Sequence, residues 1–267
     1  VLDIDGLAEP ATALVLSLPA ERAAMLNLPL LRRGRLPDPD RPDEIALAEP
    51  FALLNGLAPG ARLRAILDGQ RRELVVTGHV LSPEFIYTIG PGSLMPDDRL
   101  FGVIWMNEAP LAAAAGLGGA FNSVVMQLTR AADEAAVIAE LDRLLAPYGG
   151  TGAEGRKRQT SHAFLQSELD QLSAMARVLP PVFLVVSAFL VNMVLGRLIG
   201  LERQQIGLLK AVGYTTGAIA GHYLRLAMLI GAGGVMLGWA AGWWLGEAMT
   251  ALYAEFFRFP WLIFVAD

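Results

Sequence analysis

The chain has 267 residues, of which 54% are hydrophobic, and its formal net charge at pH 7 is −5. Lys157 and Lys210 are its two lysines, so it offers no broad cationic surface to a nucleic-acid backbone, and we expect no nucleic-acid partner. Because the chain contains no cysteine, a disulfide framework and a thiolate metal site are both excluded.

Charge divides the chain into two parts. Residues 1–155 carry 20 acidic and 12 basic side chains, whereas residues 156–267 carry 6 acidic and 9 basic ones. The chain opens on Val1 with no initiator methionine and no signal-peptide pattern. We expect a fragment, with a soluble acidic part, a basic membrane part and further membrane segments beyond either end.

The first predicted elements alternate between short strands and short helical turns. Residues 13–18 and 44–47 are strand-like, and the proline-rich stretch 36–42 between them predicts a surface loop. Residues 49–55 predict one or two helical turns, and Gly56 stands where a left-handed C-cap is needed.

A hairpin is the clearest local signal. Charged and apolar residues alternate over 61–67, and a second strand is expected over 73–80. Between them Asp68-Gly69 tolerates the positive φ angles of a tight hairpin turn.

Further along, strands are expected over 101–106 and 121–129. Asn107 can cap a short helix that ends near Gly116, and residues 133–145 predict an amphipathic helix. The first half is therefore expected to be an α+β domain, a small mixed sheet covered by helices.

A glycine-rich joint over 149–155 precedes a long amphipathic helix that begins at Ser161. This helix is predicted to be a stalk, kinked at Pro180-Pro181, where two backbone donors are missing.

Two long uncharged runs follow. Val178–Gly196 has nineteen residues and Leu226–Gly246 has twenty-one. At about 1.5 Å per residue each covers roughly 28–32 Å, close to the ~30 Å hydrocarbon core of a bilayer. A buried helix of a soluble protein would have a polar face and about 10–14 residues, so we predict a transmembrane hairpin.

Catalytic patterns are missing from the sequence. Neither lysine sits in a phosphate-binding P-loop, and no serine has a glycine two residues before it. The three histidines lack metal-ligand spacing. We expect no catalytic residues, no metal and no cofactor.

The segment between the two runs is basic. Arg197, Arg203, Lys210 and Arg225 outnumber its single acid, Glu202, so the positive-inside rule predicts that this segment is cytoplasmic. Residues 1–177 are then expected on the extracytoplasmic side.

Residues 202–213 read Glu-Arg-Gln-Gln-Ile-Gly-Leu-Leu-Lys-Ala-Val-Gly. This segment resembles the FtsX-like permease family of ABC transporters, in which a Glu-Arg-x-x-Ile-Gly-Leu-Leu-Lys-Ala-x-Gly segment joins the second and third membrane helices. Gln205 departs from the family, which commonly has Glu there. The first half resembles the MacB-like periplasmic core domain more weakly, through Arg33-Gly34-Arg35, residues 44–47 and residues 55–60.

The resemblance implies a permease subunit that does not hydrolyse ATP itself. A separate cytoplasmic ATPase would dock on the loop and move the extracytoplasmic domain. Further implied partners are a second permease copy or half and membrane lipid, in a bacterial cytoplasmic (inner) membrane that the protein crosses several times. The expected coupling-loop residues are Glu202, Arg203, Gln205, Ile206, Gly207, Lys210, Ala211 and Gly213.

The expected boundaries follow from these features. They are an incomplete MacB-like domain over 1–155, a linker and stalk over 156–179, and an incomplete membrane region over 180–267, with spans at about 180–199 and 218–247 and a loop at about 200–216.

Glycines recur every four residues in the second run, at Gly234, Gly238, Gly242 and Gly246. Small residues let membrane helices approach closely, so this strip predicts helix packing, with the first span as the expected partner. Two alternatives remain open: a membrane-anchored sensor or ligand-binding protein, and an adhesion or scaffold protein with an inert anchor.

Overall fold

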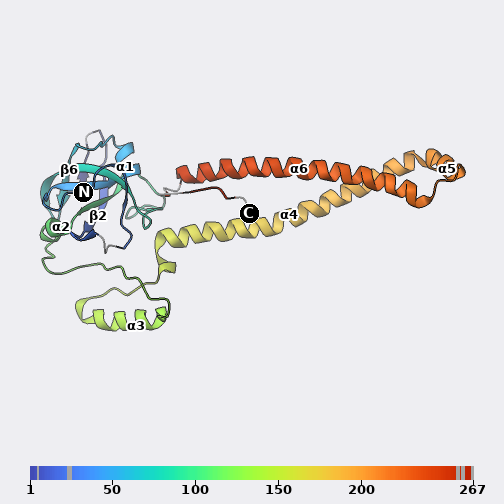
Figure 1. The fold of residues 1–267 in the computed structure, drawn as a ribbon. Helices are drawn as coiled ribbons and strands as arrows, with labels where there is room; N and C mark the ends of the chain where they lie inside the picture. Colours follow the sequence, from blue (N-terminus) through green and yellow to red (C-terminus); the bar gives the residue numbers. More distant parts are fainter. Residues whose placement is uncertain (5, 23–25, 257–258, 260–261, 266–267) are drawn as a thin grey trace. The chain divides into compact units, whose positions relative to one another are not determined.

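The computed structural model describes residues 1–267 except 5, 23–25, 257–258, 260–261 and 266–267. The chain divides into two compact units, one of residues 1–165 and 254–262 and the other of residues 166–253 and 263–267. The first unit contains a mixed sheet with helices, and the second consists of long apolar helices (Figure 1). The predicted fold class is therefore confirmed.

Seven strands form one mixed sheet in the order β1-β5-β6-β4-β7-β2, and β3 pairs with β6 off this path. Their bounds are Leu2–Asp3 for β1, Thr12–Leu18 for β2, Leu30–Gly34 for β3, Glu44–Ala48 for β4, Arg62–Leu67 for β5, Gln70–Leu81 for β6 and Phe101–Asn107 for β7. The β4–β6 and β2–β7 pairs are parallel and the others are antiparallel. β6 contacts three strands and holds the sheet together.

Both faces of the central strands are buried. Along β7, Ile104 and Met106 belong to one apolar cluster, whereas Val103 and Trp105 belong to the other. This is the two-residue alternation of a strand, and here each face meets apolar groups. It explains why residues 101–106 are an uninterrupted apolar run in the sequence.

Two short helices cover the first of these faces. α1 (Glu49–Leu54) contributes Phe51 and Ala52 to the core, and α2 (Glu108–Ala114) packs Leu111 against it. Gly102 makes room for the ring of Phe51, because a methyl group at Gly102 would lie 2.8 Å from a ring carbon.

The predicted hairpin is confirmed as β5 and β6. Asp68 and Gly69 between them have φ angles of 45° and 77°, the left-handed values that the Asp-Gly pair suggested. The predicted C-cap glycine is confirmed too, since Gly56 after α1 has a φ of 66°.

The strand expected over 121–129 is wrong. The structure has no strand there, and the residues are exposed. Local strand propensity predicted one, but a strand also needs a neighbouring backbone to pair with, and among the described residues none pairs with this segment. The next element is confirmed as α3 (Glu134–Leu145), and the carboxylate of Asp133 caps its first turn.

Asn107 stands at the N-cap of α2, as expected, but its side chain makes no capping bond. Its amide donates instead to the carbonyls of Asp38 at 2.6 Å and Arg41 at 3.0 Å. Asn107 therefore fixes the proline-rich loop rather than the helix.

Three helices make up the C-terminal part: α4 (Thr160–Leu201), α5 (Arg203–Ala211) and α6 (Thr216–Phe256). The 42 residues of α4 extend about 63 Å at 1.5 Å per residue, about twice the hydrocarbon thickness of a bilayer. Pro180 and Pro181 lie inside α4 without ending it, so the stalk and the first apolar run form one helix.

Glu44 is the buried acid of the sheet unit, and the Arg35 guanidinium donates to both of its carboxylate oxygens. The backbone N–H of Asp38 donates to Oε2 at 2.9 Å. These hydrogen bonds, led by those from Arg35, hold the pKa of Glu44 below its ordinary value of 4.5, against the opposing effect of burial.

A lowered pKa in the folded state means that Glu44 stabilises the fold above pH 4.5 and loses this contribution as the pH falls through its folded pKa. Thermal unfolding of the detergent-solubilised chain between pH 7 and pH 3 should therefore show a lower melting temperature in acid. Glu44→Gln should melt lower at pH 7 and depend less on pH. Parallel curves for the two proteins would contradict this role of Glu44.

Candidate functional site

The basic segment between the two long helices folds as a short helix. Glu202 is the N-cap of α5, and Gly213 follows its C-cap with a φ of 101°. The N–H groups of Gly213 and Tyr214 donate to the carbonyls of Lys210 and Leu209 at 3.1 and 3.0 Å. This pair of bonds is a Schellman motif, which ends the helix and requires glycine at position 213.

The outer surface of α5 combines apolar and basic groups. Leu208 is 68% exposed, Val212 is 73% exposed and Tyr214 is 56% exposed. Arg203 and Lys210 are exposed on the same helix. At about 100° per residue Leu208 and Val212 lie on the opposite side of the helix from Arg203 and Lys210. Exposed apolar residues are typical of a surface that binds another protein.

The other predicted coupling residues differ in how exposed their side chains are. Gln205, Gly207 and Ala211 are exposed, whereas Ile206 is half-buried. Ile219, near the beginning of α6, is buried. Ile206 is therefore more covered than its neighbours on α5, and the most exposed apolar positions are Leu208 and the C-cap Val212.

A side-chain hydrogen bond joins the N-cap of α5 to α6. The Tyr223 hydroxyl donates to Oε2 of Glu202, and both side chains are half-buried. Sequence reasoning singled out Glu202 but missed Tyr223, because a partner 21 residues away leaves no local pattern. It also missed Leu208 and Val212, since their exposure depends on how α5 is oriented.

The glycine strip lies along α6. No atom of the described chain comes within 4 Å of a methyl group placed at Gly234, Gly238 or Gly242, and at Gly246 the nearest atom is Cε2 of Phe264 at 2.7 Å. Packing of this strip against another helix thus stays a prediction.

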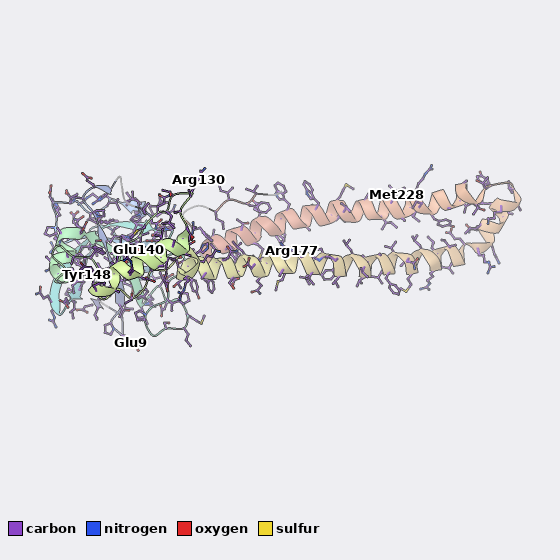
Figure 2. The ribbon with its side chains drawn as sticks, turned by 90° about the horizontal axis from the view of Figure 1, so that it is seen from below. Glu9, Arg130, Glu140, Tyr148, Arg177 and Met228 are labelled. Atoms are coloured by element: carbon purple, nitrogen blue, oxygen red, sulfur yellow. The ribbon has the colours of Figure 1, made fainter. Side chains whose placement is uncertain are left out.

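The two long helices expose a largely apolar surface. Both are long and apolar enough to cross a membrane by length and composition, and no part of their most apolar windows is buried. Arg177 on α4 and Met228 on α6 carry side chains that point away from the helix (Figure 2). Such surface is compatible with lipid and costly in water.

No group of three or more His, Asp and Glu side chains in the described part of the chain could hold a metal ion. Residues 177–267 match the family model described as FtsX-like permease C-terminal. The matched range begins inside α4 and includes α5, α6 and the glycine strip. A comparison with curated proteins gives no match.

Proposed function

We propose that this chain is an FtsX-like permease, the membrane component of an ABC transporter system, because residues 177–267 match the C-terminal model of that family, and that α5 is the docking site of a cytoplasmic ABC ATPase. ATP hydrolysis on that separate subunit would move α5, and α4 would carry the movement to the sheet unit across the membrane. The work done there would be export, extraction of a lipoprotein or lipid, or control of another extracytoplasmic protein.

The observation that carries this proposal is the surface of α5. Leu208 on α5 and Val212 and Tyr214 just after it are exposed, as are Arg203 and Lys210, at the turn between two helices that can span a membrane. The hydrogen bond from Tyr223 to Glu202 joins this surface to α6, so a force on α5 would reach the spans.

The orientation rests on charge. Arg197, Arg203, Lys210 and Arg225 lie near α5, which favours the cytoplasm for this end of the helices. We propose that residues 1–177 lie outside the cytoplasmic membrane of a bacterium and that residues 1–155 are a MacB-like periplasmic core domain. The domain limits given above are part of this proposal.

Leu208→Asp tests the docking site, because a charge buried unpaired in an apolar contact is strongly unfavourable. Co-purification of an ABC ATPase with the chain, quantified by mass spectrometry, should fall at least tenfold, which corresponds to about 1.4 kcal/mol of binding free energy. Leu208 is 68% exposed in the chain alone, so folding and membrane insertion should survive.

Leu94→Asp is the matched control, since Leu94 is 94% exposed in the sheet unit. It should leave ATPase binding unchanged. Undiminished binding to Leu208→Asp would refute docking at α5, and a wild-type chain that binds no ATPase would favour the sensor alternative.

We also propose that Gly234, Gly238, Gly242 and Gly246 pack against a helix of a second permease copy or half. Three of the four positions are open in the single chain, and close approach of backbones is what small residues permit in lipid.

Gly238→Leu should therefore lower self-association in lipid vesicles, measured by energy transfer between labelled copies. Gly233→Leu is the control, because an added methyl group at Gly233 also meets nothing within 4 Å, and Gly233 lies about 100° around the helix from Gly234. Equal losses in both variants, or no loss in either, would show that the strip is not an interface.

A further inference from the structure

We infer that the first turn of α4 is clamped to the segment Ser82–Tyr87, and that through this clamp the sheet unit moves together with α4. The inference rests on the proposed function for the origin of the movement. The clamp itself rests on contacts among described residues, all of which lie in the sheet unit.

Ser161 is the centre of the clamp. It is 3% exposed, and its Oγ lies 2.7 Å from the carbonyl oxygen of Glu84 and 2.9 Å from that of Tyr87. The hydroxyl donates its single hydrogen to one of these carbonyls at a time, and it accepts from the N–H of Tyr87 at 3.3 Å. A residue at the beginning of a helix thus satisfies the backbone of a segment 74 residues away.

Gln159 strengthens the same contact from the position before the helix. Its Nε2 donates to the carbonyl of Glu84 at 2.7 Å, while its Oε1 accepts from the N–H of His162 at 2.7 Å. One side chain therefore caps one of the free N–H groups of α4, that of His162, and holds the segment Ser82–Tyr87. Breaking the contact would leave partly buried polar groups unpaired.

An aromatic pair closes the contact on its apolar side. The rings of Tyr87 and Phe164 stack with their centroids 3.8 Å apart and their planes 6° from parallel. Phe164 lies one helical turn after Ser161, so the hydrogen bonds and the stacked rings involve the same turn of α4.

The clamped segment is itself held by the core of the sheet. Ser82 is buried and directly follows β6, the strand that pairs with three others. Phe85 packs edge to face against the buried ring of Trp105 on β7, with centroids 5.9 Å apart. A displacement of the first turn of α4 would therefore be passed to the central strands β6 and β7.

The covalent route between the sheet and α4 is much looser. It runs from α2 through residues 115–160, all of which the structure describes, and none of them is buried. A connection of this length with no buried residue passes on a displacement less directly than a buried contact does. The noncovalent clamp is the more direct connection.

The variant Gln159→Ala/Ser161→Ala tests the clamp, with Ser167→Ala as the control on an exposed position of the same helix. Spin labels are placed at Arg71→Cys on β6 and Ala163→Cys on α4, both exposed positions in a chain that has no cysteine of its own. The distance distribution should be narrow in the labelled wild type and in Ser167→Ala, and several-fold broader in the double variant. Equal widths in all three would overturn the clamp.

Adding the co-purified ATPase and ATP tests the coupled movement. In the labelled wild type the distance should not change, because sheet and helix move together, whereas the double variant should respond to ATP. A response of the wild type, or of neither protein, would overturn the coupled movement. Absence of ATPase binding would instead refute the proposed function. The widths of the distance distributions measured without ATPase would still show whether the clamp exists.

Discussion

The membrane part depends on one constraint: the apolar surface of α4 and α6 must be kept from water. No part of the described chain covers their most apolar windows, so lipid or another membrane helix must do so. In lipid the backbone has to satisfy its own hydrogen bonds, which an unbroken helix does. This requirement explains why the apolar run of α4 is helical throughout, and the helix extends from Thr160, in the clamp, to Leu201, just before α5.

The features that were predictable from sequence are those with a local cause. The Asp68-Gly69 turn, the left-handed Gly56 and the charge-free runs each follow from the chemistry of a few neighbouring residues. The strand expected over 121–129 failed because pairing depends on a partner that the segment's own sequence does not specify. The contacts of Tyr223 and Ser161 stayed hidden for the same reason, since their partners lie 21 and 74 or more residues away.

Two hydrogen-bonded contacts give the proposed movement a path. At the beginning of α4, Ser161 and Gln159 hydrogen-bond to the segment that follows β6. Beyond the end of α4, Tyr223 hydrogen-bonds to Glu202, the N-cap of α5. Both contacts leave polar groups unpaired when they break, so they favour movement of the joined elements as units. The membrane helices would then transmit movement from the ATPase on the cytoplasmic side of the membrane to the sheet unit on the extracytoplasmic side.

Movement of the sheet unit by an ATPase bound to α5 requires that α5 and the sheet lie on opposite sides of the membrane. Single cysteines at Leu94 and Thr215, both exposed in a cysteine-free chain, report this directly. In spheroplasts an impermeant thiol reagent should label Leu94→Cys at once and Thr215→Cys only after the membrane is opened. Immediate labelling of both positions, or of Thr215→Cys alone, would contradict the account.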